Sequence, residues 1–128
     1  MGSILRGLAT ISTAIILAAC SGSGTPTAGP GEGTPSAAVC ADSTGTTVVA
    51  ATVENNTWSQ PVNAKVNDVI TWTNNDGVPH RVELDNGSCV MGGNIAGGSS
   101  RSLTFSTAGT YPFHCKVHNS MKGTITIT

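Results

Sequence analysis

The sequence predicts an all-β domain of the Greek-key β-sandwich class, preceded by a targeting segment and a linker. Short runs rich in β-branched and aromatic residues alternate with turn residues, and no window shows convincing helical periodicity. Charged residues make up only 10% of the 128-residue chain, while Gly, Ser and Thr are abundant. Seven or eight short strands in about 90 residues are typical of two sheets packed face to face.

The first nineteen residues resemble a targeting signal. Arg6 precedes an uncharged, mostly apolar run, Leu8–Ala19. A run of about a dozen residues is too short to span a membrane, which takes roughly 20, but it suits a signal peptide. The run ends in Leu17-Ala18-Ala19-Cys20, which resembles the bacterial lipobox. We expect a lipoprotein signal peptide over residues 1–19 and a lipid on Cys20; the alternative is an ordinary secretory signal.

A linker is expected to follow, so that residues 20–38 form the lipid anchor and a flexible Gly/Ser/Thr/Pro segment. Ser21–Ala38 contains no large apolar side chain and cannot bury enough surface to offset the entropy of ordering. The mature chain would then be extracytoplasmic and lipid-anchored to the bacterial cell membrane.

The remaining residues, 39–128, are expected to form the folded domain. Turn signals such as Asn74-Asn75-Asp76-Gly77 and Asp85-Asn86-Gly87 separate its β-rich runs. The expected strands are Thr46–Val53, Val62–Val66, Val69–Thr73, His80–Leu84, Arg101–Phe105, Thr110–Cys115 and Gly123–Thr128. The chain has six Lys or Arg and seven Asp or Glu, and its basic residues form no stripe. We therefore expect no nucleic-acid partner. We expect a monomer.

The segment Gly109–Gly123 carries the chemistry. Cys115, His118 and Met121 stand three residues apart in a loop between two expected strands, and His80 offers a second imidazole from upstream. Two His and one Cys with a weak axial Met form the ligand set of blue-copper electron-transfer sites. These four residues are therefore predicted to bind one copper ion.

Each ligand also has an ordinary structural alternative. His80 could be a turn histidine, Cys115 a buried thiol and Met121 a core residue. His114 is excluded as a ligand because strand alternation turns it to the side opposite Cys115. Met91 is expected to pack in the core, with the axial position as its alternative role.

From Val69 to the C-terminus the chain resembles the plastocyanin/amicyanin branch of the cupredoxins. The matching pieces are Val69-Ile-Thr-Trp-Thr-Asn, Val78-Pro-His-Arg-Val, Leu103-Thr-Phe-Ser-Thr-Ala-Gly-Thr-Tyr and Cys115-x-x-His118-x-x-Met121-Lys-Gly. The resemblance implies a cupredoxin fold, one type 1 copper ion cycling between Cu(I) and Cu(II), and redox partner proteins. It also implies that the electron leaves through His118.

Three positions near the ligands depart from the family pattern. Val117 and Asn119 stand where the family often has Pro, so we expect a less rigid loop and a new N–H donor near the Cys115 sulfur. Arg81 stands where cupredoxins frequently have an Asn, whose side chain connects the two ligand segments. Because Arg replaces Asn here, it is open whether this connection is made.

Two of the four cysteines already have expected roles, Cys20 in lipid attachment and Cys115 in copper binding, so Cys40 and Cys89 remain. An oxidising compartment favours a disulfide between them. The alternative is two separate free thiols.

Three classes of function compete for this ligand set. A one-electron carrier is the first, and a copper-binding or copper-delivery protein without a redox circuit is the second. A copper enzyme is disfavoured because a four-ligand site leaves no open position for substrate.

Overall fold

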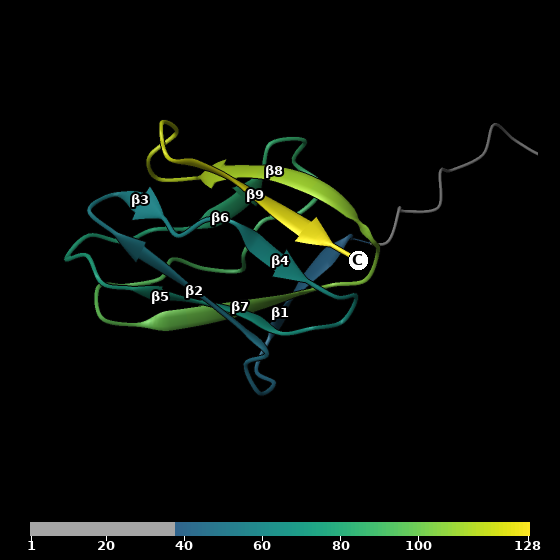
Figure 1. Ribbon diagram of the computed structural model, residues 1–128. Helices are drawn as coiled ribbons and strands as arrows, with labels where there is room; N and C mark the ends of the chain where they lie inside the picture. Colours follow the sequence, from purple (N-terminus) through teal and green to yellow (C-terminus); the bar gives the residue numbers. More distant parts are fainter. Residues whose placement is uncertain (1–37) are drawn as a thin grey trace, which may run out of the picture. The chain divides into compact units, whose positions relative to one another are not determined.

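A computed structural model describes residues 38–128, which form two β-sheets packed face to face (Figure 1). The expected signal peptide, Cys20 and the linker up to residue 37 lie outside the described residues. In the described part the strands are β1 (Cys40–Ser43), β2 (Val49–Glu54), β3 (Thr57–Trp58), β4 (Val62–Ala64), β5 (Ile70–Asn74), β6 (Val82–Leu84), β7 (Ser100–Phe105), β8 (Gly109–Cys115) and β9 (Lys122–Ile127). Residues 38–128 contain no helix long and apolar enough to cross a membrane.

The first sheet has five strands in the order β1-β7-β5-β2-β3, and the second has four in the order β4-β9-β8-β6. Most neighbours are antiparallel, but β2 with β5 and β4 with β9 are parallel. The predicted all-β sandwich is confirmed.

Several strand boundaries differ from those expected. The predicted strand Thr46–Val53 begins only at Val49, and Val62–Val66 stops at Ala64, before Asn67 turns the chain with a φ of 67°. The predicted strand His80–Leu84 begins at Val82, because His80 forms an isolated bridge with Ile95 instead. β1 and β3 were not expected: β3 is two residues long, and β1 carries no β-branched residue.

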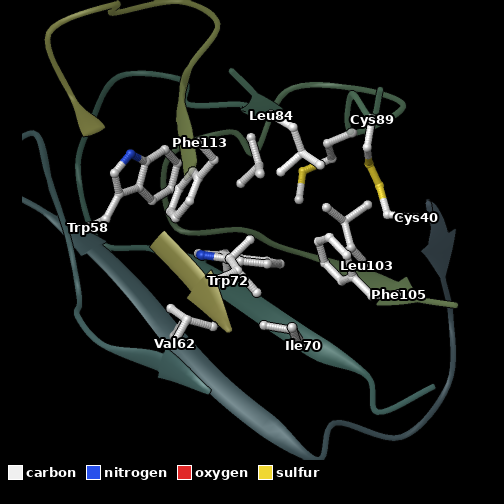
Figure 2. Packing of buried hydrophobic residues seen from close by; sticks show 14 of the residues in the cluster. Cys40, Trp58, Val62, Ile70, Trp72, Leu84, Cys89, Leu103, Phe105 and Phe113 are labelled. Atoms are coloured by element: carbon white, nitrogen blue, oxygen red, sulfur yellow. A yellow bond between two sulfur atoms is a disulfide. The ribbon is translucent and has the colours of Figure 1, made fainter. Parts of the chain in front are cut away.

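Alternation along the strands builds the core between the sheets. In β5 the buried residues are Ile70, Trp72 and Asn74, and in β8 they are Phe113 and Cys115. Trp72 and Phe113 are fully buried and their ring centroids lie 6.3 Å apart (Figure 2). Because Cys115 follows this alternation, the fold turns its thiol toward the interior.

The connection between β8 and β9 lies at one end of the sandwich, and the described chain begins at the other (Figure 1). The carbonyl of Val39 accepts a hydrogen bond from the N–H of Ser106, just before β8 starts at Gly109. β8 then runs seven residues, or about 20 Å at 3.3 Å per residue, to Cys115.

Candidate metal centre

The β8–β9 loop is held by three backbone hydrogen bonds. The N–H of His118 donates to the carbonyl of Cys115 at 3.1 Å, and the N–H of Met121 donates to the carbonyl of His118 at 2.9 Å. The N–H of Cys115 donates back to the carbonyl of Met121, also at 2.9 Å. These bonds bring the three loop residues predicted as ligands into one compact turn.

His80 reaches the same place from the segment before β6. Its backbone N–H donates to the carbonyl of Ile95 at 3.1 Å, and the N–H of Ile95 donates to the carbonyl of His80 at 2.7 Å. The His80 side chain is fully buried, and its ring centroid lies 5.0 Å from that of His118.

Three donor atoms converge at this point. Nδ1 of His80 lies 3.7 Å from Sγ of Cys115, and Nδ1 of His118 lies 3.8 Å from the same sulfur. A metal bonded to sulfur at about 2.3 Å and to nitrogen at about 2.0 Å in a trigonal arrangement would separate such donors by about 3.7 Å. Imidazole suits copper in both oxidation states and thiolate favours Cu(I), so the donor set fits a copper ion.

The two methionines occupy different places. Met121, the predicted axial ligand, ends the ligand loop and is 5% exposed. Met91 is fully buried and belongs to the core cluster, and its N–H donates to the carbonyl of Val82. This burial agrees with the packing role expected for Met91.

Asp76 was expected only as part of a turn, but it contacts the His80 ring directly. Its Oδ2 lies 3.0 Å from Nε2 of His80, and its two oxygens also accept the N–H groups of Asn55 and Asn56. The N–H of Asn56 is the main cause that holds the pKa of Asp76 below its ordinary value, with smaller contributions from Asn55 and His80 and partial opposition from burial. An ionised carboxylate can only accept, so Nε2 carries the ring proton and Nδ1 is free to bind a metal.

Arg81 ties the two ligand segments together through its backbone. Its N–H donates to Sγ of Cys115 at 3.4 Å, and its carbonyl accepts the N–H of Lys116 at 2.8 Å. The Arg81 side chain turns away, and its Nε donates to the carbonyl of Met91 at 2.6 Å. The backbone of Arg81 therefore connects the two ligand segments, as the Asn side chain does in many cupredoxins.

The expectation that the Val117 N–H lies as a donor near the Cys115 sulfur is wrong. Among the described residues, the backbone N–H that donates to the Cys115 sulfur is that of Arg81, and Val117 makes no such bond. Hydrogen bonds within the loop run between Cys115, His118 and Met121, so they bypass the Val117 N–H.

His114 lies away from the donors, as strand alternation requires. Its Nδ1 is 2.6 Å from a carboxylate oxygen of Asp85, and its Nε2 is 3.6 Å from Glu83. Lys116 and Lys122 continue this mixed-charge row on the outer face of the sheet.

Cys40 and Cys89 form a disulfide that joins β1 to the segment after β6 (Figure 2). The carboxylate of Asp42 reinforces the connection by accepting the N–H of Gly92 at 2.8 Å. Cys115 is the one free cysteine among residues 38–128.

Asn74 and Trp58 also support the site, although neither was expected there. The buried Asn74 amide donates to the carbonyls of Val78 and Ile95, which shapes the segment that carries His80. The indole of Trp58 lies against the His80 ring. An Asp four residues before a ligand His is a signal that could have identified Asp76; the sequence around Trp58 offers none.

The fold and the converging donors define a small metal-binding β-sandwich protein. A family model described as the cupredoxin-like domain matches residues 13–127. The chain therefore belongs to the cupredoxin-like family.

Named relatives agree with this family. The chain is 38% identical over 78 residues to the plastocyanin of Scenedesmus fuscus, in a match covering 52% of this chain and 80% of that protein. It is 34% identical over 70 residues to the amicyanin of Paracoccus denitrificans, a match that spans 52% of this chain and only 53% of that protein. A solved structure of an oxidised amicyanin mutant superposes with a TM-score of 0.57 at 28% identity, covering 62% of this chain and 81% of the mutant. The Cu(I) form of another amicyanin mutant superposes with a TM-score of 0.56 at 29% identity, and the match covers 62% of this chain and 81% of that mutant.

Proposed function

We propose that this protein is a type 1 copper protein that carries single electrons between redox partner proteins at the outer face of the membrane. The observation that carries the proposal is the convergence of Nδ1 of His80, Sγ of Cys115 and Nδ1 of His118. One copper ion bound there supplies the chemistry, a one-electron cycle between Cu(I) and Cu(II). Met121 is the proposed axial ligand.

The protein's part is to hold the donors in place while the charge changes. Asp76 fixes the His80 ring and its tautomer, the bridge to Ile95 fixes the His80 backbone, and the Arg81 N–H stabilises the thiolate of Cys115. Donors that are already in position need little rearrangement when an electron arrives or leaves.

His118 is the proposed exit for the electron. It is only half-buried, whereas His80 and Cys115 are fully buried. Val117 beside it is 43% exposed. The buried donors also disfavour the copper-delivery alternative, which needs ready exchange of the metal.

Membrane attachment is proposed through a lipid on Cys20. The lipobox-like Leu17-Ala18-Ala19-Cys20 supports it. The described chain begins at the end of the domain opposite the β8–β9 loop (Figure 1). An anchor at that end leaves the ligand loop free for partners.

The optical spectrum of the copper-loaded protein tests the function. The oxidised protein should be intensely blue from thiolate-to-copper charge transfer, and Cys115→Ser should lose the colour. His114→Ala is the matched control, since this neighbour of Cys115 should leave the colour unchanged. A colourless Cu(II) form of the intact protein would refute the type 1 assignment. A reversible one-electron wave in voltammetry separates a carrier from a copper-delivery protein.

Mass spectrometry of the mature chain tests the anchor. A lipid on Cys20 with no residue before it is expected, and Cys20→Ala should release the domain or block processing. Unmodified protein free in the medium would contradict the anchor and leave the copper assignment intact.

A further inference from the structure

We propose that Trp58 is the positioning residue that fastens the ligand loop to the His80 ring. This inference rests on the proposed copper function. Trp58 lies in β3, in the sheet opposite the one that carries the ligand loop, and is 3% exposed. It belongs to none of the segments that supply ligands.

The first contact of Trp58 is with the end of the ligand loop. Its indole Nε1–H donates to the carbonyl oxygen of Met121 at 3.3 Å. The same oxygen accepts the N–H of Cys115, so one carbonyl joins the first ligand of the loop, the last ligand and the indole. A buried indole N–H usually finds a partner, and here that partner is the backbone of Met121, which would be the fourth residue to hold the copper ion.

The second contact is with the other ligand segment. The Trp58 and His80 ring centroids lie 5.9 Å apart with an interplanar angle of 68°, an edge-to-face arrangement that limits rotation of the imidazole. Phe113 also packs against the indole, with a centroid distance of 5.3 Å (Figure 2). One side chain therefore contacts both His80 and the carbonyl of Met121 in the β8–β9 loop.

This arrangement explains how the loop is held without proline. Val117 and Asn119 are exposed, and neither fixes φ with a ring at the two positions where the family often has Pro. The hydrogen bond from Trp58 in the opposite sheet adds to the three backbone bonds of the loop and restrains its Met121 end.

Trp72 provides a matched comparison within the same domain. It is also buried, but its Nε1 has no hydrogen-bond partner, and its ring packs against Phe113 in the core. Trp→Phe removes the same atoms at both positions, but only Trp58→Phe removes a bond to the ligand loop.

Amide hydrogen exchange of the metal-free protein is the first test. In Trp58→Phe the amides of Cys115, His118 and Met121 should exchange about fivefold faster, as expected for the loss of one net hydrogen bond. Trp72→Phe should leave these rates close to those of the unmodified protein after correction for global stability. Equal exchange in the two variants would overturn the inference.

Copper-loaded protein gives the second test. Trp58→Phe should shift the charge-transfer band and the reduction potential, and Trp72→Phe should leave both in place. If the wild type is blue but Trp58→Phe shifts neither the charge-transfer band nor the reduction potential, the role of Trp58 is refuted and the copper assignment stands. A colourless wild type would refute the copper assignment, while the exchange test would still decide the loop restraint.

If Trp58→Phe does not fold, proton NMR of the indole N–H groups in the unmodified protein tests the hydrogen bond of Trp58. The Trp58 N–H, with its carbonyl acceptor, should resonate downfield of the Trp72 N–H, which has none. The reverse order would contradict the hydrogen bond.

Discussion

Oδ2 of Asp76 lies 3.0 Å from Nε2 of His80 and holds the ring proton on the nitrogen that faces away from Cys115. His80 is fully buried, so without this acceptor its N–H would have to find another partner. A carboxylate four residues before the ligand therefore decides which nitrogen can bind a metal.

Asp76→Asn should weaken copper binding by about 10- to 100-fold, the usual cost of losing a partner of a ligating histidine. An amide presents one oxygen and one NH2 group, and these cannot accept all three of the N–H groups that now meet the carboxylate. Competition with a chelator of known affinity measures the change. Asp68→Asn is the control, because Asp68 accepts only the N–H of Lys65 in a distant turn; equal losses in both variants would contradict the role of Asp76.

Acidification should remove the contribution of Asp76 to the stability of the metal-free protein. Its pKa is lowered in the folded state, so the contribution is complete above the unfolded-state value, near pH 4, and disappears as pH falls through the folded value. Urea unfolding at pH 6 and pH 3 should show a difference between wild type and Asp76→Asn that shrinks on acidification. A difference that stays constant would show that the carboxylate titrates normally.

Replacing both Cys40 and Cys89 with Ala should lower the free energy of unfolding by about 4 kcal/mol, because the bond closes a separation of 49 residues in the unfolded chain. Urea unfolding measures this loss. The blue colour should survive, since neither cysteine lies among the three converging donors. Bleaching in the folded double variant would mean that the disulfide supports the metal centre.

Asn119→Pro should stabilise the protein by about 0.4–1 kcal/mol. Met121 N–H donates to the carbonyl of His118, which places Asn119 second in a four-residue turn, where proline is favoured. Thermal unfolding measures the effect, and Asn119→Ala is the control because alanine does not fix φ. A destabilised variant would show that the backbone at position 119 departs from the proline range.

The sequence predicted the sandwich because short β-rich runs, separated by turn residues, recur along residues 39–128 and become strands such as β5 and β8. It also predicted the three donors that converge, because two His and a Cys match the blue-copper ligand set and stand in segments that resemble the cupredoxins.

Most of the contacts it missed join residues that are distant in sequence; the contact of Asp76 with His80, four residues apart, is an exception. Trp58 meets Met121 across 63 positions, and β3 is too short to carry a strand pattern. Asn74 was assigned to a turn because of its residue type, yet it ends β5 with its amide buried. Arg81 acts through its backbone, which no side-chain pattern can reveal.

The β8–β9 loop has an evolutionary consequence. His114 pairs with Lys122, so the register of the two strands is set outside the seven residues from Cys115 to Met121. Insertions or substitutions inside the loop can occur without moving a strand, whereas the buried bridge between His80 and Ile95 leaves no such freedom. The length of the loop and its residues other than the proposed ligands are therefore less constrained by strand pairing than the segment around His80.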